Sequence, residues 1–324
     1  MTSTVKEGPL KREARRDPPD LPTGIIVKGV GGLYTIRTDE GRVLLAKPRG
    51  IFRKKHMVPT VGDRVGYEKS GDPDIPFVIS SISRRKNLML RPPISNLDVL
   101  ILTFSTQQPV PYLEMLDKLL ILCAQNAIRP VIWITKMDLD PEFGESFRSV
   151  YSDAGYDVVC STNTEPIPSE ILPKYFAGNI VGFAGQSGVG KSTLCNMLTG
   201  ISEREVGIIS ERLNTGKHTT RHVELYPFEA GYLADSPGFT NLDILRMQVE
   251  TGDVRLGYNE LDRISNKCRF EDCLHIGEKG CAIEEARMDP GRLERYRSFI
   301  RETSSKSALK SNDREKKHEE KNTH

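Results

Sequence analysis

The first third of the chain alternates apolar and polar residues with the period of two that is typical of half-buried β-strands. Alternating runs cover residues 24–36, 42–46, 61–67 and 77–82, and turns rich in Gly, Asp and Pro separate them. These runs predict five short strands. Their spacing favours a small closed barrel of the OB type, so we expect an all-β domain over residues 21–91.

The pattern changes in the middle of the chain, where apolar residues form short continuous runs. Such runs occupy residues 131–134, 158–160, 180–184 and 232–234. Continuous apolar strands separated by helical segments are typical of an α/β domain with a buried sheet. We expect this domain to cover residues 92–250.

Both ends of the chain are polar, charged and without apolar periodicity. We expect residues 1–20 and 304–324 to be disordered tails. With 324 residues and 37% hydrophobic content, the chain can bury sizeable cores in two or three domains. Internal repeats are not evident in the sequence.

A phosphate-binding pattern, G-x-x-x-x-G-K-[ST], follows the apolar run 180–184. It comprises Gly185, Gln186, Ser187, Gly188, Val189, Gly190, Lys191 and Ser192, and Thr193 comes next. Backbone N–H groups of such a loop surround phosphate oxygens at the start of a helix, here near Lys191. Lys191 is expected to reach the β- and γ-phosphates and Ser192 to bind Mg²⁺. A Gly-rich turn that binds nothing is the alternative, and the Lys-Ser-Thr that follows argues against it.

A candidate guanine-reading motif follows the run 131–134 and comprises Thr135, Lys136, Met137 and Asp138. The Asp138 carboxylate can accept two N–H bonds from the base edge, and the aliphatic stem of Lys136 can cover the base face. Thr135 stands where GTPases usually have Asn. We expect this replacement to weaken the bracing of the site more than its choice of base.

A second base-contacting loop would lie at Ser161, Thr162 and Asn163, after the run 158–160. A plain loop is an equal alternative there.

Beyond the phosphate loop, residues 235–238 follow the run 232–234. Asp235 can hold the Mg²⁺ shell and the N–H of Gly238 can meet the γ-phosphate, although this sequence alone is that of an ordinary turn.

Residues 216–222 are polar and lie between these two motifs, as expected for a switch segment that orders around γ-phosphate and Mg²⁺. Thr220 is the expected Mg²⁺-sensing hydroxyl, because Thr-Thr-Arg resembles the switch of translation-associated GTPases, and Thr219 is the alternative. A basic surface loop is the other interpretation.

Phe239 follows Gly238, at the position where many GTPases have a Gln that orients the attacking water. Intrinsic hydrolysis should therefore be weak, and His218 is a candidate to orient the water.

The base-reading motif precedes the phosphate loop, whereas GTPases usually have the reverse order. This order indicates a circularly permuted domain, which is tolerated if the original termini lay close together. The element after residues 235–238 then continues into the C-terminal segment, so the nucleotide state could be transmitted there directly.

The C-terminal segment, residues 251–303, contains a cluster of metal-binding residue types: Cys268, Cys273, His275 and Cys281. Four such ligands suit a tetrahedral structural Zn²⁺ and leave no open position for catalysis. We expect so short a segment to have little core without its metal. Disulfides are the alternative, but we expect no secretory signal and no membrane span, and therefore a cytoplasmic location. Three other cysteines, Cys123, Cys160 and Cys195, fit core positions.

Basic residues are concentrated at the start of the chain. Residues 1–91 hold 19 Lys and Arg against 10 Asp and Glu, whereas the rest hold 27 against 34. The basic residues that we expect to face RNA are Lys47, Arg49, Arg53, Lys54, Lys55, Arg84, Arg85 and Lys86. A basic loop that is merely solvated is the alternative.

A basic OB-like barrel, a permuted GTPase and a Cys-Cys-His-Cys module in one chain resemble the bacterial family of ribosome small subunit-dependent GTPase A, over about residues 21–303. The resemblance implies a cytoplasmic, monomeric enzyme of late 30S maturation that uses GTP, Mg²⁺ and one structural Zn²⁺. It implies slow turnover alone, stimulation by the 30S subunit, and rRNA contacts of barrel and zinc module. An ATP-using phosphotransferase and an RNA-binding scaffold with a structural nucleotide are the rival hypotheses.

Overall fold

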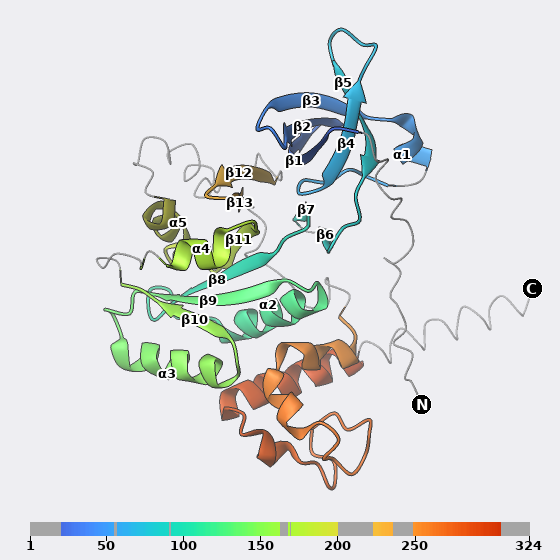
Figure 1. Ribbon diagram of the computed structural model, residues 1–324. Coiled ribbons are helices and arrows are strands. Elements are labelled where there is room, and N and C mark those ends of the chain that lie inside the picture. Colours follow the sequence, from blue (N-terminus) through green and yellow to red (C-terminus); the bar gives the residue numbers. More distant parts are fainter. Residues whose placement is uncertain are drawn as a thin grey trace, which may run out of the picture. The chain divides into compact units, whose positions relative to one another are not determined.

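The computed structural model describes residues 21–54, 57–90, 92–162, 168, 170–199, 223–235 and 249–305 (Figure 1). The chain divides into two compact units. The first combines Met1–Val99, Pro168–Gly182 and Thr199–Gly238, and the second combines Leu100–Ile167, Phe183–Leu198 and Phe239–His324. The predicted tails lie outside the described residues, except that the last helix continues through residue 305.

A closed barrel forms the N-terminal part of the first unit. Its strands are β1 (Thr23–Val30), β2 (Leu33–Thr38), β3 (Val43–Pro48), β4 (Arg64–Lys69) and β5 (Phe77–Ile82), and α1 (Gly50–Lys54) follows β3. β1, β2 and β3 pair antiparallel in sequence, β3 pairs parallel with β5, and β4 pairs with both β5 and β1. The inward positions of the alternating runs, such as Ile26, Ile36 and Val65, are fully buried. The predicted five-stranded OB-like barrel is confirmed.

The same unit contains strands of the α/β region. β12 (Glu224–Phe228) pairs antiparallel with β13 (Gly231–Asp235), and β13 pairs parallel with β11 (Ile180–Gly185). β12 also pairs with β1 of the barrel, where Lys28 Nζ lies 2.9 Å from Glu224 Oε2. This pairing was not predicted from the sequence. α4 (Ile171–Phe176) and a short hairpin, β6 (Leu88–Leu90) with β7 (Pro93–Ser95), complete the unit.

The second unit contains three neighbouring strands in the order β10 (Asp157–Cys160), β9 (Arg129–Thr135) and β8 (Val99–Ser105). β8 is buried along its whole length, which explains its continuous apolar sequence. α2 (Leu113–Gln125), α3 (Pro141–Asp153) and α5 (Lys191–Thr199) belong to this unit. The Asp140 carboxylate caps α3 by accepting the Phe143 N–H at 3.0 Å, and Pro141 occupies the first turn.

The C-terminal segment of the second unit packs beside α2 and α3 (Figure 1). It contains the 3₁₀ helices η1 (Thr251–Gly257), η2 (Asn259–Ile264) and η3 (Ile283–Ala286), and a helix over residues 290–305. Tyr258, Leu261, Tyr296 and Phe299 form a buried core with Ile121 of α2. The expectation that this segment has little core without a metal is therefore wrong.

A buried ionic network joins α2 and α3 to the C-terminal helix. Arg292 Nη1 lies 2.6 Å from Asp117 Oδ1 and its Nε lies 2.7 Å from Glu260 Oε1, while Arg295 Nε donates to the other Asp117 oxygen at 2.5 Å. Tyr151 also donates to Asp117, at 2.9 Å. Burial alone would lower the pKa of Arg292, but the facing carboxylates raise it above its ordinary value. Fully buried charges are stable only when paired in this way.

A similar pair closes a turn of the barrel. Arg85 Nε and Nη2 each lie 2.7 Å from one oxygen of Asp63, whose side chain is fully buried. Asp63 also accepts the Thr60 N–H at 2.8 Å, and Arg85 donates to the Val58 carbonyl. Arg85 is therefore a structural residue of the barrel.

Several other basic residues expected to face RNA are also paired within the protein. Lys47 lies beside Asp72, Arg49 beside Glu68 and Lys86 beside Asp98. Of the expected RNA-facing residues, Arg49, Lys54, Arg84 and Lys86 are exposed, while Lys55 and the side chain of Arg53 lie outside what the structure describes. The charge count alone overstated the free basic surface of the barrel.

We expect Arg85→Ala to lower the free energy of opening of the barrel by about 2 to 3 kcal/mol, because Asp63 would be left buried without its partner. Arg64→Ala is the matched control, because the exposed Arg64–Asp39 pair should contribute less than about 1 kcal/mol. Hydrogen exchange of the barrel amides in the full chain measures both. Equal, small effects of the two changes would contradict the structural role of Arg85.

Candidate nucleotide-binding site and metal centre

The candidate phosphate loop joins β11 to α5, which begins at Lys191 as predicted. Gly185, Gly188 and Gly190 have φ values of 140°, 81° and 91°, a region that favours glycine. At Gly185 a Cβ atom would also lie 2.0 Å from the Thr103 carbonyl oxygen of β8. The turn out of β11 therefore requires glycine for both conformation and space.

Lys191 lies folded against its own loop. Its Nζ donates to the Gly185 carbonyl at 2.9 Å and to the Gln186 carbonyl. Burial lowers the pKa of Lys191 to about 8, because the charged ammonium is partly removed from water. A bound phosphate would favour the charged form again. Ser187 and Thr193 are exposed, and Ser192 lies in the first turn of α5.

The candidate base-reading turn begins where β9 ends, at Thr135. The buried Thr135 hydroxyl donates to the Val189 carbonyl of the phosphate loop at 2.6 Å, and its oxygen lies 3.3 Å from the Phe104 carbonyl. Thr135 therefore braces the end of β9 against the phosphate loop, although we expected weaker bracing than with the usual Asn. A hydroxyl at this position reaches the phosphate loop directly.

The rest of the turn lies against the same loop. Lys136 has a φ of 56°, and its Nζ donates to the Gly188 carbonyl at 3.1 Å and to the Gln108 carbonyl. The Leu139 N–H donates to the Lys136 carbonyl at 3.0 Å and closes the turn, which leaves Asp138 exposed. The structure thus brings the two motifs together although the chain order is reversed.

The loop after β10 is tied to this turn. The Met137 N–H donates to the Ser161 carbonyl at 3.2 Å, and the Trp133 indole N–H donates to the Ser161 hydroxyl at 2.9 Å. Thr162 follows and is half-buried, whereas Asn163 lies outside the described residues. Ser161 is therefore placed next to the base-reading turn.

Sequence reasoning missed the segment between β8 and α2, which lies beside both motifs. The Thr106 hydroxyl donates to the Lys136 carbonyl at 2.6 Å. The Gln186 amide accepts the Tyr112 N–H at 2.7 Å and donates to the Val110 carbonyl at 3.1 Å. No sequence motif marks residues 106–112, so only the hydrogen bonds identify their place.

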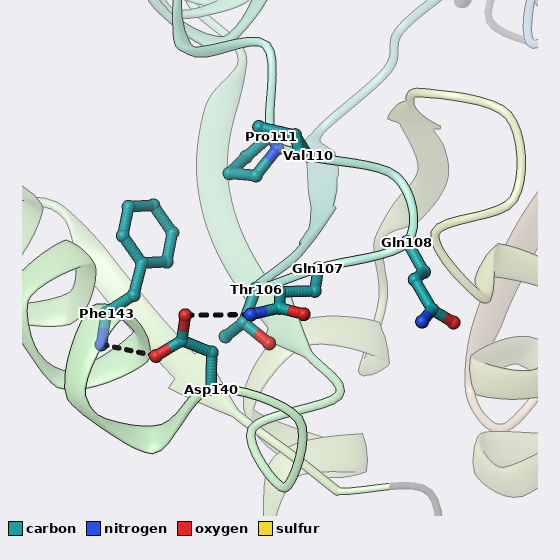
Figure 2. A pocket seen from close by; sticks show the side chains of 7 residues that line it. All are labelled: Thr106, Gln107, Gln108, Val110, Pro111, Asp140 and Phe143. Atoms are coloured by element: carbon teal, nitrogen blue, oxygen red, sulfur yellow. Dashed lines mark hydrogen bonds between the residues drawn. The ribbon is translucent and has the colours of Figure 1, made fainter.

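A pocket of about 400 Å³ lies between this segment and the start of α3 (Figure 2). Gln107 Nε2 donates to Asp140 Oδ2 at 3.0 Å across it, and Phe143 covers one side. The hydrogen bond from Gln107 and the Phe143 N–H together lower the pKa of Asp140. The ionised Asp140 therefore fixes the start of α3, directly after the base-reading turn.

The remaining predicted nucleotide residues are described less fully. Asp235 is the last residue of β13, where its backbone pairs with Glu224, and nothing is described of its side chain or that of Ser192. The predicted switch residues His218, Thr219, Thr220, Gly238 and Phe239 lie outside the described residues.

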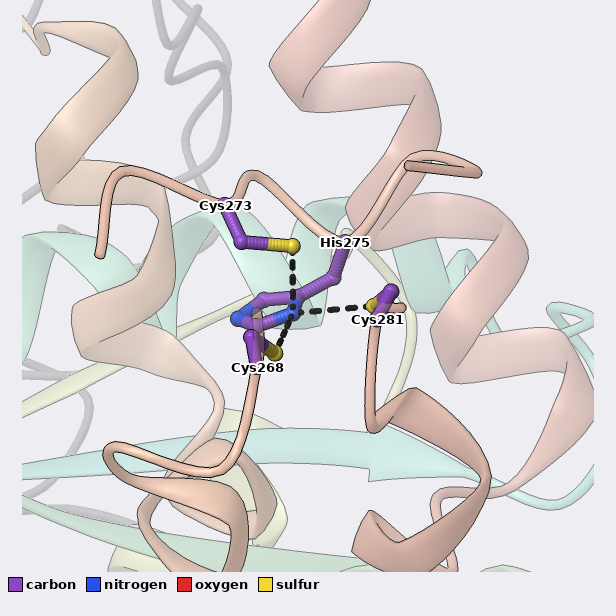
Figure 3. Close-up of side chains that lie close together, drawn as sticks. All are labelled: Cys268, Cys273, His275 and Cys281. Carbon is purple, nitrogen blue, oxygen red and sulfur yellow. Dashed lines mark hydrogen bonds between the residues drawn. The ribbon is translucent and has the colours of Figure 1, made fainter. Parts of the chain in front are cut away.

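The Cys/His cluster converges on one point (Figure 3). His275 Nδ1 lies 3.6 Å from the sulfurs of Cys268 and Cys273 and 3.3 Å from that of Cys281, and all four ligand atoms lie within 4.8 Å of one another. Ligand atoms of a tetrahedral zinc site are separated by about 3.6 to 3.8 Å, given Zn–N and Zn–S distances of about 2.0 to 2.3 Å. The arrangement is compatible with zinc.

Two further contacts hold the loop that carries these ligands. The Glu278 carboxylate accepts the N–H groups of Leu274 and Ile276, each at 2.8 Å. The Tyr296 hydroxyl of the C-terminal helix donates to the Leu274 carbonyl at 3.0 Å. The cluster is thereby fixed to the core of the second unit.

Within the described part of the chain, none of the helices has the length and apolar character needed to span a membrane.

A phosphate loop joined by a buried hydrogen bond to a base-reading turn that precedes it in the chain defines a circularly permuted P-loop GTPase. The chain belongs to the RsgA GTPase family, whose GTPase model matches residues 82–245. The model of the RsgA N-terminal domain matches residues 23–74, within the barrel. The resemblance to this family and the hydrolysis of GTP are thus confirmed.

Two curated relatives and two solved structures are similar over most of their lengths. The small ribosomal subunit biogenesis GTPase RsgA of Bacillus velezensis is 38% identical, covering 87% of this chain and 97% of its own. The protein of that name from Ruminiclostridium cellulolyticum is also 38% identical, covering 84% and 91%. The crystal structure of YloQ, a circularly permuted GTPase, matches with a TM-score of 0.72 at 31% identity over 90% of this chain and 99% of that one. YjeQ from Thermotoga maritima gives 0.71 at 30% identity, over 87% and 98%.

Proposed function

We propose that this GTPase acts in the cytoplasm as a monomer on the small ribosomal subunit, binds rRNA during late 30S maturation, and is released after subunit-stimulated hydrolysis. The observation that carries the proposal is the combination of a joined base-reading turn and phosphate loop with an OB-like barrel in one chain. Relatives that match nearly their whole length are named for small-subunit biogenesis, which supports the choice of partner.

We further propose a division at residues 21–91 for the RNA-binding barrel, 92–250 for the GTPase and 251–303 for the zinc module. Lys54 and Arg84 are two of the exposed cations of the barrel, and we assign them to RNA phosphates. Arg85, whose partner Asp63 is fully buried, is assigned to the stability of the barrel. The more exposed pairs of Lys47, Arg49 and Lys86 should each contribute less than about 1 kcal/mol.

In the proposed mechanism, Asp138 reads the guanine edge and the stem of Lys136 covers the base face. Lys136 keeps this place because its ammonium already bonds the phosphate-loop carbonyl of Gly188. Ser161 and Thr162 complete the wall of the base site together with Asn163. Base recognition thus rests on groups that the fold holds before the nucleotide arrives.

The phosphates are proposed to bind the backbone N–H groups of residues 185–190. Lys191 would exchange its bonds to the loop carbonyls for the β- and γ-phosphate oxygens, so the charge that burial disfavours gains an anionic partner. Ser192, Thr220 and Asp235 would hold Mg²⁺, which neutralises phosphate charge when bound. The N–H of Gly238 would meet the γ-phosphate.

Hydrolysis needs a group that orients the attacking water. Phe239 cannot do this, and it occupies the position where many GTPases have Gln. We assign the role to His218 in a switch arranged by the docked subunit. The protein then works as a timer, because GTP is hydrolysed quickly only after correct docking.

We propose that Cys268, Cys273, His275 and Cys281 hold one structural Zn²⁺. Four protein ligands leave no site for a substrate. Because the core around Tyr258 and Phe299 consists of buried apolar side chains and includes Ile121 of α2, we assign the metal a local role. It fixes the loop of residues 266–282, which we expect to touch rRNA.

Added 30S subunits should raise the rate of GTP hydrolysis at least about tenfold over the free protein, a change in the barrier of only about 1.4 kcal/mol. Lys54→Glu with Arg84→Glu should reduce this stimulation while leaving basal turnover unchanged. The defect should grow with salt concentration, because phosphate contacts are weakened by competing counterions. Phosphate release with purified subunits measures these effects.

Arg148→Glu is a charge-reversal control, to be compared with each single barrel variant, since Arg148 is exposed on α3 and outside the barrel. It should retain stimulation. Equal stimulation by 50S subunits, or none by either subunit, would contradict the choice of partner. Stable nucleotide binding without turnover under any condition would favour the scaffold hypothesis.

Cys273→Ser should remove the bound zinc and expose the backbone of residues 266–282, while the core around Tyr296 and Phe299 stays protected, because that core packs on α2. Metal analysis and hydrogen exchange of the full chain measure both effects. Cys160→Ser, a half-buried cysteine outside the cluster, should keep the metal. Purified protein without zinc, or loss of protection across all of residues 251–303, would contradict the local role.

A further inference from the structure

Gly144 is an unexpected residue in the interior of α3 (Pro141–Asp153). Glycine destabilises a helix interior relative to alanine, because it loses more backbone freedom on folding. Gly144 is not one of the glycines with positive φ, so its backbone conformation does not require glycine. The reason for a glycine must therefore lie in the space around it.

That space is filled by the base-reading turn. A Cβ atom on Gly144 would lie 2.6 Å from Met137 Sδ and 2.7 Å from Met137 Cε, well inside van der Waals contact. Gly144 itself is buried. The side chain of Met137 thus lies directly over the bare backbone of α3.

Met137 stands between the two residues assigned to the base, Lys136 and Asp138. Its backbone N–H is bound to the Ser161 carbonyl, and the turn is closed by the bond from Leu139 to Lys136. The Met137 side chain is therefore the group by which the turn is packed against α3. A shift of this side chain would move the turn that presents the Asp138 carboxylate.

Thr106 forms the other side of the space. Its methyl carbon would lie 3.0 Å from a Cβ on Gly144, while its hydroxyl holds the Lys136 carbonyl at 2.6 Å. A methyl group at position 144 would thus press on both side chains that hold the turn. Displacement of the Met137 thioether spares the helix, whereas the β-branched Thr106 has few other rotamers and its hydroxyl holds the turn, so we expect the turn to shift while the helix stays folded.

We propose that Gly144 is a positioning residue for guanine recognition: it leaves the space that Met137 fills, and so fixes the place of Lys136 and Asp138. The proposal rests on the proposed function of Asp138 as the base reader. Gly144 touches neither base nor phosphate, so it should affect affinity for the nucleotide and not the chemical step.

Gly144→Ala in the full chain should weaken GDP binding and raise the KM for GTP about fivefold, with kcat at saturating GTP unchanged, because binding shared by ground and transition states is lost. Ser149→Ala is the control, since Ser149 is exposed on the same helix, and it should leave both constants unchanged. If Gly144 were needed only for packing, alanine would lower the free energy of unfolding and leave KM unchanged. That result would overturn the positioning role.

A double-mutant cycle tests whether Met137 carries the effect. In a Met137→Val background the side chain no longer reaches the space over α3, so Gly144→Ala should cause a much smaller further loss of GDP affinity, due to Thr106 alone. The same fivefold loss in both backgrounds would show that Gly144 acts in another way and would overturn the proposal.

The preference of the unmodified protein for GDP over ADP distinguishes a failure of the Gly144 proposal from a failure of the base-reading function. A strong preference for GDP, with Gly144→Ala binding GDP normally, would overturn only the role of Gly144. Equal binding of GDP and ADP would overturn the base-reading function on which the proposal rests.

Discussion

The hydrogen bond from the Thr135 hydroxyl to the Val189 carbonyl is the contact on which the nucleotide site depends. It joins the end of β9 to a phosphate loop that comes 54 residues later, and both residues are buried. Loss of a buried hydrogen bond costs about 1 to 3 kcal/mol when one partner is left unsatisfied. Lys136 adds a second link through Gly188. These two contacts bring the base-reading turn and the phosphate loop together although their order in the chain is reversed.

The second unit also contains a continuous set of contacts from the phosphate loop to the metal cluster. Gln186 bonds the backbone at Val110 and Tyr112, directly before α2. Asp117 of α2 is the buried partner of Arg292 in the C-terminal helix. The same helix reaches the loop of the metal ligands through Tyr296. These contacts connect the phosphate loop and the C-terminal module within the second unit.

Local patterns in the sequence predicted the five barrel strands, the phosphate loop, the base-reading turn and the convergence of Cys268, Cys273, His275 and Cys281, because each depends on neighbours a few positions apart. Contacts between distant segments could not be predicted. The pairing of β12 with β1 leaves no periodic signal. Arg292 and Asp117 are far apart in the sequence, so their ion pair could not be predicted. Arg85 looks like an ordinary surface charge in the sequence, because the burial of its partner Asp63 is evident only in the structure. The reason for a glycine at position 144 could not be predicted either, because it depends on the nearby side chain of Met137.

We propose that Asp138, in the turn that Thr135 joins to the phosphate loop, selects guanine. The most direct test is the affinity of Asp138→Asn for guanosine and xanthosine diphosphates. Loss of the paired carboxylate should weaken GDP binding by about 2 to 4 kcal/mol and shift the preference toward the xanthine nucleotide, whose 2-carbonyl suits the new amide. An unchanged preference for guanine in this variant would contradict the claim.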